Sequence, residues 1–438
     1  MSDADLIIRG GQVVTSTTVA AADVAVAGGR ITAVGPALGL SAVEEIDASG
    51  FHVFPGGIDS HVHFNEPGRT EWETIANGSA ALAAGGYTAF IDMPLNNLPV
   101  TTDATAFDMK LGAMKGSSIV DYGLWAGLVP GNLDHLDELV DVGAMGFKAF
   151  MCPSDIDEFP ASDERTLREG MKRIAELGSI LLVHAEDPAW LVTGPPGHGA
   201  EDFLRSRPPQ AELAAIELVI DIATETGCKL HVVHVSTARG AEMIGEALLR
   251  GVDVSGETCP HYLLYADEDL ERLGGMGKCA PPFRAAADRD ALWQMVADGL
   301  LPMVVSDHSP SALDLKQGDD FFKIWGGISG CQTTRQLLLA QDKLDLPIIA
   351  AVTATNVARR FGIARKGDIA VDMDADLWLV DLSHEDVVRP QDLLYRNPFS
   401  VHEGQRIRGK TIRMILRGRT VFPEGQPAGE FIRPRAHS

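Results

Sequence analysis

Between Val53 and Pro310, short apolar runs alternate with longer stretches in which apolar positions recur every three to four residues. The short runs have the length and flanking turn residues of buried strands, and the longer stretches have helical spacing. Such alternation is typical of repeated strand–helix units around a parallel sheet. The predicted strands are "HVFPGGIDSHVHF", "TAFIDMP", "VDYGLWAGL", "GFKAFM", "ILLVHAE", "LHVVHVS", "VDVSGETCP" and "MVVSDHSP".

The segments between these runs predict amphipathic helices. Examples are "ETIANGSAALAAGG", "ERTLREGMKRIAELG", "AELAAIELVIDIATETG" and "AEMIGEALLRG", each of which ends at a glycine suited to a helix C-cap. Eight strand–helix units over roughly 250 residues favour a closed (β/α)8 barrel of TIM type, in which the chemistry lies at the carboxyl ends of the strands. An open, doubly wound sheet has the same periodicity, so the pattern alone leaves both architectures open.

The two ends of the chain have a different pattern. "DLIIRGGQVV" and "DVAVAGGRITAVG" near the start, and "ADLWLVDL" and "IRMILRGRTVF" near the finish, are rich in strand-forming residues and glycine turns. Residues 6–14 and 414–422 also share an Arg-Gly pair after three apolar positions. We therefore predict that residues 1–52 and 366–438 join in one small β domain beside a barrel of residues 53–365.

Composition narrows the class of function. The 438 residues are 45% hydrophobic and 22% charged, as in globular proteins that bury a large core. A formal net charge of −24 argues against a nucleic-acid or anionic-membrane partner, because binding phosphates requires clustered Lys and Arg. A small neutral or weakly charged substrate fits better. The sequence shows no signal peptide and no membrane-spanning run, which predicts a cytoplasmic protein.

The stretch "SHVHFNEPGR" introduces the candidate chemistry. His61 and His63 are two positions apart, so on a strand both rings project from the same face. Alone, this pair is equally consistent with two core histidines or with two ligands of one cation. Further polar residues, however, interrupt the apolar runs at the same end of other predicted strands; they are Lys148, His184, His234 and Asp307. Around a closed barrel, these six side chains would surround one mouth.

Six such residues are difficult to explain as ordinary core. A buried lysine or aspartate costs several kcal/mol unless it is paired or binds a metal. Four imidazoles and one carboxylate can hold two divalent cations, but two cations need a bridging anion. The neutral amine of Lys148 can add carbon dioxide to give that bridge, a carbamate (N6-carboxylysine), and a bridging hydroxide completes the site. The alternative for Lys148 is a salt-bridged or snorkelling lysine, which would be favoured if it stood alone.

The histidine-rich ligand set favours zinc, although iron, cobalt or manganese could also serve. Other histidines are expected to lie outside the metal site. His231 stands three residues before His234, so on a strand it should face the opposite side and pack outward. His261 and His308 adjoin the candidate segments without an assigned role, and the "HEGQ" at His402 is expected to be unrelated to the site.

These segments closely resemble the cyclic amidases of the amidohydrolase superfamily, which comprise hydantoinases, dihydroorotases and allantoinases. The resemblance covers nearly the whole chain, from "GGIDSHVHF" through "GFKAFM", "HAE", "ETCPHYL" and "CAPPFR" to "SDHSP". It implies a (β/α)8 barrel with a β-sandwich formed from both chain ends. It also implies hydrolysis of a cyclic amide C–N bond and assembly as a homotetramer.

Within this branch, "HFNEPGRTEWE", "MPLNNLP", "SDHSP" and "WGGISGCQ" resemble the allantoinases. Dihydroorotases carry Arg, Asn and His at the positions of Asn65, Ala280 and Ser311, and hydantoinases carry Tyr at the position of Pro153. The resemblance therefore implies hydrolytic opening of the uncharged hydantoin ring of allantoin to allantoate, a step of purine breakdown. A broad-specificity hydantoinase or dihydropyrimidinase is the alternative. A non-catalytic relative used as a scaffold is a further one, although such proteins typically lose ligands.

The resemblance also assigns roles to the six residues. One metal is expected on His61, His63 and Asp307, and the other on His184 and His234, with carbamylated Lys148 between them. Asp307 is the expected catalytic residue, which takes a proton from the hydroxide and passes it to the departing ring nitrogen. The expected substrate contacts are Asn65, Asn96 and the backbone near Gly327.

Overall fold

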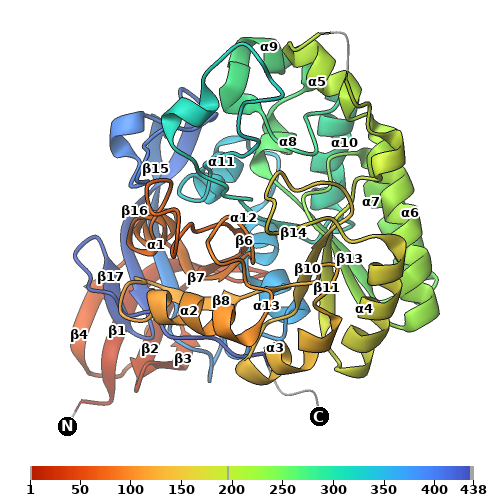
Figure 1. The fold of residues 1–438 in the computed structure, drawn as a ribbon. Helices are drawn as coiled ribbons and strands as arrows, with labels where there is room; N and C mark the ends of the chain where they lie inside the picture. Colours follow the sequence, from red (N-terminus) through yellow and green to blue (C-terminus); the bar gives the residue numbers. More distant parts are fainter. Residues whose placement is uncertain (1, 195–196, 435–438) are drawn as a thin grey trace.

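The computed structural model describes residues 2–194 and 197–434, and it contains a (β/α)8 barrel (Figure 1). Every pairing between its strands is parallel. A bridge between Val62 and His308 joins the last unit to the first, so the predicted closed barrel is confirmed. β8 (Asp121–Leu124) and β9 (Ala126–Gly127) together make the third barrel strand, since β8 pairs with β7 and β9 with β10. The other barrel strands are β6 (Gly57–Val62), β7 (Tyr87–Asp92), β10 (Phe147–Phe150), β11 (Ile180–His184), β12 (Lys229–Val232), β13 (Val254–Thr258) and β14 (Met303–Val304).

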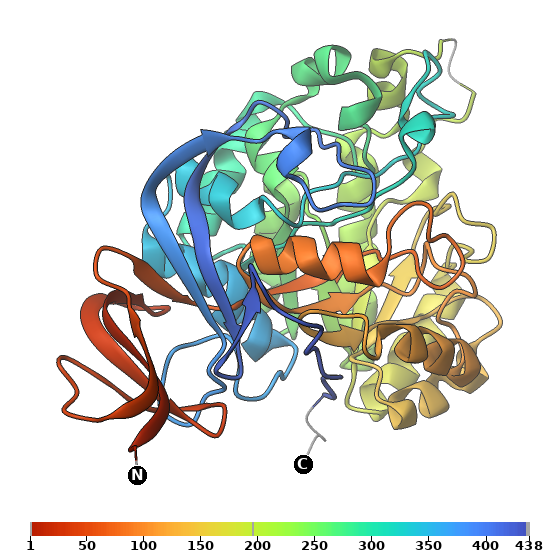
Figure 2. The ribbon, with the colours of Figure 1, turned by 90° about the vertical axis from the view of Figure 1, so that its left-hand side faces the viewer.

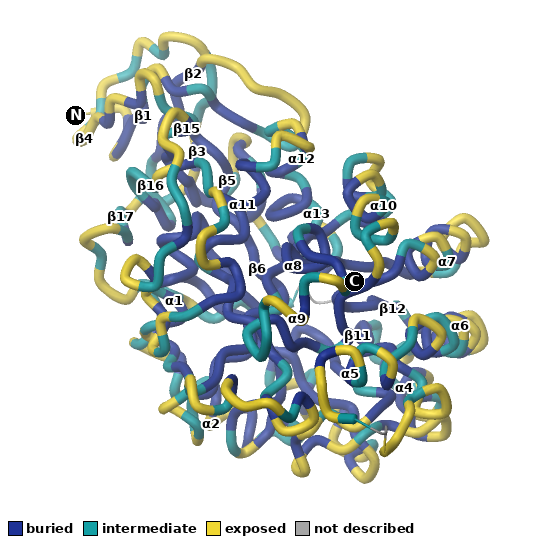
Figure 3. Tube along the Cα trace, turned by 90° about the horizontal axis from the view of Figure 1, so that it is seen from above, coloured by how far each residue is buried: buried dark blue, intermediate teal, exposed yellow. Residues whose placement is uncertain are grey.

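The helices cover the outside of the barrel and expose their outer faces, as the yellow outer edges of α4, α6, α7 and α10 show (Figure 3). None of the described helices is long and apolar enough to cross a lipid bilayer. They are α1 (Ile75–Ala84), α2 (Ala104–Met114), α3 (Leu136–Val142), α4 (Glu164–Glu176), α5 (Ala200–Ser206), α6 (Pro209–Thr226), α7 (Ala238–Leu249), α8 (Pro260–Leu264), α9 (Leu270–Leu273), α10 (Ala286–Ala297), α11 (Thr334–Ala340), α12 (Leu346–Ala350) and α13 (Asn356–Arg360).

The four helices quoted from the sequence are present as α1, α4, α6 and α7. Two of them end at a glycine cap as predicted: α1 ends at Gly85, and α6 ends at Gly227 with a left-handed φ of 69° that favours glycine. In α4 and α7 the last helical turn closes earlier, on Leu177 and Arg250, and the left-handed glycine follows one residue later.

Strands from both chain ends form one eight-stranded sheet in the described residues, which makes the β-sandwich domain predicted from the sequence. Figure 2 shows the red amino-terminal and blue carboxyl-terminal strands side by side next to the barrel. Their apolar positions, among them Ile8, Val24 and Leu377, pack into a core of their own. The strands are β1 (Ala4–Val14), β2 (Val19–Ala27), β3 (Arg30–Gly35), β4 (Ala42–Asp47), β5 (His52–Pro55), β15 (Leu377–Val387), β16 (Arg406–Leu416) and β17 (Arg419–Phe422).

The first predicted strand, residues 52–64, is two strands in the structure. β5 pairs with β1 and β15 in the terminal sheet, whereas β6 pairs with β7 in the barrel. Gly56 lies between them, where a side chain would collide with Thr88. The apolar pattern continues through this point because both strands are buried, and so the pattern alone could not reveal the crossing.

Candidate metal centre

The six predicted ligands gather at the carboxyl end of the barrel. They lie within, or directly after, strands β6, β10, β11, β12 and β14, where parallel strands present their ends to one mouth. Five of them line a cavity of about 70 Å³, and Lys148 projects from β10, the strand next to β11. The five are His61, His63, His184, His234 and Asp307.

The first group of donors converges on Asp307. The Nε2 atoms of His61 and His63 lie 3.1 and 3.4 Å from the same carboxylate oxygen, Oδ1 of Asp307. Asp307 has a φ of 45°, an uncommon conformation for a residue other than glycine and one that clusters at functional sites. Two imidazoles and a carboxylate at one point form a donor set suited to a divalent cation.

The second group contains His184 and His234, whose ring centroids are 4.7 Å apart. His234 also lies 5.4 Å from the ring of His61, so it connects the two groups. Burial lowers the pKa of His184, and it lowers the pKa values of His61 and His234 well below the usual value. All three rings are therefore neutral near pH 7, which is the form that binds a metal.

Lys148 is fully buried, and its Nζ has no hydrogen-bond partner among the described residues. Burial lowers the pKa of this amine to about 8. An unpaired ammonium in such a place is costly, whereas a neutral amine is both cheaper to bury and able to add carbon dioxide. The orphaned Nζ beside the histidines thus fits the two-cation ligand set expected from the sequence.

Two buried carboxylates at the site were not predicted. Oε1 of Glu257 lies 2.6 Å from Nδ1 of His61, and Oε2 of Glu186 lies 2.8 Å from Nε2 of His184. Glu186 could have been noticed from "HAE", since it is two residues from a candidate ligand. Glu257 stands in the apolar run "VDVSGETCP", where a single acidic residue on a buried strand was the available signal.

The prediction that His231 packs outward is wrong. Its ring is fully buried, with Nδ1 2.7 Å from Oγ of Ser255 and Nε2 3.1 Å from Oε2 of Glu257. The alternation of faces that the prediction assumed stops where β12 ends, at Val232, and His234 beyond it has a φ of 39°. His231 and His234 can therefore both lie near the barrel interior.

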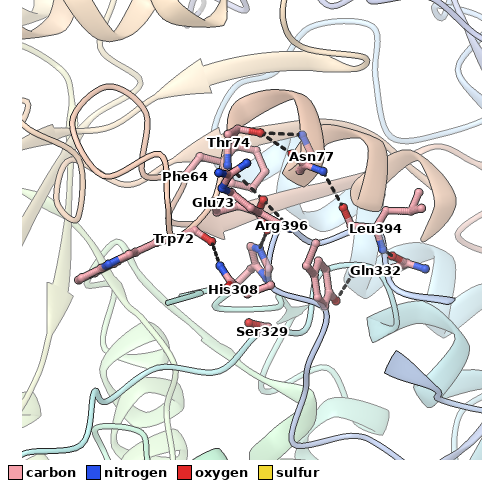
Figure 4. A network of polar contacts seen from close by, with 12 residues as sticks. Phe64, Trp72, Glu73, Thr74, Asn77, His308, Ser329, Gln332, Leu394 and Arg396 are labelled. Carbon is pink, nitrogen blue, oxygen red and sulfur yellow. Dashed lines mark hydrogen bonds and ion pairs between the residues drawn. The ribbon is translucent and has the colours of Figure 1, made fainter. Parts of the chain in front are cut away.

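His308 and His402 do not line the cavity, and both contact other segments of the chain. Nδ1 of His308 accepts a hydrogen bond from the Gly330 amide, and its Nε2 lies 3.6 Å from Oε2 of the buried Glu73 (Figure 4). Glu73 also accepts hydrogen bonds from the Arg396 amide. This network ties the segments after β6 and β14 to the carboxyl-terminal segment. His402 stacks on Tyr265 away from the cavity.

The three predicted substrate contacts lie in different environments. Asn96 lines the cavity with a left-handed φ of 76°, and its Nδ2 donates to Oγ of Ser309. Gly327 also lines the cavity, and its carbonyl accepts from Nζ of Lys316. Asn65 is fully buried and does not line it; instead its Nδ2 donates to the carbonyl of Asn96 at 3.2 Å. Asn65 thus contacts a cavity residue from behind.

Two positions at which the sequence differs from hydantoinases or dihydroorotases also line the cavity. Pro153 and Ala280 are in its wall, so neither the tyrosine nor the asparagine expected at these places is available to a ligand. Ser311, the third such position, is buried and is not part of this wall. The differences from hydantoinases and dihydroorotases therefore fall partly on the surface that a substrate would contact.

Comparisons with known proteins agree with this geometry. The profile of the amidohydrolase family matches residues 52–421. The chain is similar to the allantoinase of Rubrobacter xylanophilus, with 51% identity over 99% of each chain. It is also similar to the allantoinase of Solibacter usitatus, with 47% identity over 99% of this chain and 98% of the relative. Among solved structures, the L-hydantoinase (dihydropyrimidinase) from Arthrobacter aurescens superposes with a TM-score of 0.95 and 31% identity, covering 99% of this chain and 100% of that one.

Proposed function

The chain belongs to the amidohydrolase family, and from this premise we propose that it opens the hydantoin ring of allantoin to give allantoate, a step of purine catabolism. The observation that carries this proposal is full-length similarity to allantoinases at 39 to 51% identity. The cavity agrees with it, because Pro153 and Ala280 replace groups that relatives use for other rings. A small cavity in a chain of net charge −24 also suits an uncharged ligand.

The activity is metal-dependent, and the donor set supports a proposal for the residues that would hold the ions. We propose two divalent cations, with zinc as the preferred metal. His61, His63 and Asp307 would hold one and His184 and His234 the other, with the carbamate of Lys148 shared between them. Bound cations of this kind lower the pKa of water toward neutrality and polarise a carbonyl oxygen.

The chain's own residues supply orientation and proton transfer. The side chain of Asp307 is 14% exposed, whereas the four proposed ligand histidines are more deeply buried. The carboxylate of Asp307 is therefore open to the cavity. It would take the proton of the attacking water and deliver it to the ring nitrogen as the C–N bond breaks. Asn96 and the backbone at Gly327 would hold the ring by hydrogen bonds, since both line the same cavity.

A broad-specificity hydantoinase is the second candidate, and the close superposition on a hydantoinase favours it. Ring-opening assays on allantoin, hydantoin, dihydrouracil and dihydroorotate, together with metal analysis, separate the two. We expect allantoin to give the highest kcat/KM and the active protein to contain two metals per chain. Faster turnover of hydantoin would exclude the allantoinase proposal, and an active metal-free protein would exclude the metal mechanism.

The assembly is a further proposal. We propose a homotetramer, as the resemblance implies, and light scattering on the purified chain would measure its mass directly. A monomer of 46.8 kDa would contradict it.

A further inference from the structure

The four ligand histidines are not held alike. A histidine that binds a metal through one ring nitrogen has a hydrogen on the other, and the partner of that hydrogen fixes the ring. For His61 the partner is Glu257, 2.6 Å from Nδ1, and for His184 it is Glu186, 2.8 Å from Nε2. Arg207 keeps Glu186 ionised, and an ionised carboxylate only accepts hydrogen bonds, so the hydrogen of His184 lies on Nε2. For His61, Nε2 faces Asp307, which leaves Nδ1 to hold the hydrogen toward Glu257.

This assignment leaves the opposite nitrogens free for a metal. In His61 the free atom is Nε2, which is the atom that faces Oδ1 of Asp307 at 3.1 Å. In His184 the free atom is Nδ1. By contrast, Nδ1 of His63 and Nδ1 of His234 have no hydrogen-bond partner within the part of the chain that the structure describes. Each proposed cation therefore has one histidine anchored by a carboxylate and one that is not.

The two carboxylates are themselves stabilised differently, although both are fully buried. Glu186 receives an ion pair from Arg207, at 2.5 Å, and the backbone carbonyl of Arg207 accepts a hydrogen bond from Arg284. Glu257 has no contact with a lysine or arginine among residues 2–194 and 197–434; its neighbours are His61, His231 and the hydroxyl of Ser60. A buried carboxylate without a cation is costly. Burial accordingly raises the pKa of Glu257 to about 8, against the attraction of Lys148, and its direct contacts are His61, His231 and Ser60 rather than a basic side chain.

We propose that Glu257 and Glu186 are positioning residues, one for each metal position, that fix the hydrogen and the orientation of His61 and His184 respectively. The inference rests on the proposed two-cation site. It adds that the two positions are supported independently, each through its own histidine. Removing one carboxylate should therefore weaken the binding of one cation and leave the binding of the other unchanged.

The test is a calorimetric titration of the metal-free protein with Zn²⁺ in the presence of bicarbonate. Glu257→Gln and Glu186→Gln keep the shape of the side chain and remove its charge. Each variant should weaken one of the two binding events about 10- to 100-fold and leave the other within about threefold of wild type. Glu212→Gln is the matched control, because Glu212 is equally buried but binds Ser236 and Arg284 rather than a histidine. It should leave both events unchanged.

Double variants assign each event to its position. His63→Ala removes a ligand expected for the same cation as His61, so combining it with Glu257→Gln should weaken that event again and spare the other. Combining it with Glu186→Gln should weaken both. The assignment would be overturned if Glu186→Gln and His63→Ala weakened the same Zn²⁺ binding event and Glu257→Gln weakened the other.

Failure of the inference is distinguishable from failure of the proposed function. A wild-type protein that binds no Zn²⁺ refutes the metal site itself. A wild type that binds two, with both glutamine variants also binding two at unchanged affinity, overturns the positioning roles. Thermal unfolding of the metal-free variants provides the structural readout: a lower Tm with intact Zn²⁺ affinities would make the carboxylates purely structural. If a glutamine variant does not fold, Glu257→Asp or Glu186→Asp retracts the carboxylate while keeping its charge, and the same selective loss is expected.

Discussion

Two buried lysines, Lys148 at the mouth of the barrel and Lys366 where the barrel meets the terminal sheet, show how burial alone fails to define a role. The Nζ of Lys366 lies 2.5 Å from Asp376, 2.7 Å from Asp121 and 3.5 Å from Asp374. The Nζ of Lys148 has no hydrogen-bond partner in the described chain, and it lies 5.0 Å from the ring centroid of Phe150.

The contrast also appears in the acid–base properties of the two amines. Burial alone would lower both pKa values. For Lys366 the attraction of Asp376 and Asp121 outweighs burial and raises the pKa. For Lys148 burial dominates over the more distant acids, and the pKa falls to about 8. Lys366 is therefore a permanent cation with a structural role, whereas the lowered pKa and unpaired Nζ of Lys148 suit the chemical role that we propose for it.

The largest effect is expected from Lys148→Ala. Loss of the bridging group should abolish binding of at least one metal and reduce kcat/KM more than about a thousandfold, since metal activation supplies several kcal/mol. Steady-state assays on allantoin and metal analysis of the purified variant measure both effects. Short carboxylic acids such as formate should restore part of the activity by occupying the vacated bridge. Full activity without any addition would contradict a bridging role.

Lys366→Met should lower the stability of the protein without affecting its activity or metal content, the reverse of what is expected for Lys148→Ala. It leaves Asp376 and Asp121 buried without their main cation, and breaking a buried pair from one side costs about 3–5 kcal/mol. Urea unfolding should show this loss of free energy, while kcat/KM per folded molecule and the metal content stay at wild-type values. Loss of metal without loss of stability would show that the two lysines do not differ as described.

The third prediction concerns pH. Only the neutral amine adds carbon dioxide, and with a pKa of about 8 for Lys148 the neutral fraction rises with pH. At fixed dissolved CO₂, the metal-free protein should therefore regain activity on addition of Zn²⁺ about 25-fold faster at pH 8.5 than at pH 6.5. Lys366→Met should give the same profile, because its amine takes no part. A rate independent of pH would argue against carbamate formation at Lys148.

Much of the candidate site could be predicted from the sequence because its proposed ligands are polar residues in otherwise apolar strands. That signal is local: His61, Lys148 and Asp307 are each conspicuous against their own neighbours. The closed barrel gave the common geometry, since strand ends of a parallel barrel meet at one mouth.

The features that could not be predicted from the sequence depend on contacts between distant segments or on local breaks in the regularity of a strand. Glu257 meets His61 across 196 positions of sequence, which no local pattern reports. His231 was misplaced because β12 ends before the alternation of faces would have carried it outward. The crossing at Gly56 was missed because apolar residues continue on both sides of it.

The smallest expected effect comes from Arg417→Met at the same junction as Lys366. Arg417 also pairs with Asp121 and donates to the carbonyl of Ala428, but its side chain is 24% exposed, so water partly replaces the lost interaction. Lys366 remains beside Asp121 in the variant, which leaves the carboxylate compensated. We therefore expect a loss of about 1–2 kcal/mol in urea unfolding, smaller than for Lys366→Met, and no change in metal content. In the double variant Asp121 loses both cations, so the combined loss should exceed the sum of the two single losses. Simple additivity would mean that Lys366 and Arg417 do not share Asp121, and the junction would then be a set of separate pairs rather than one buried cluster.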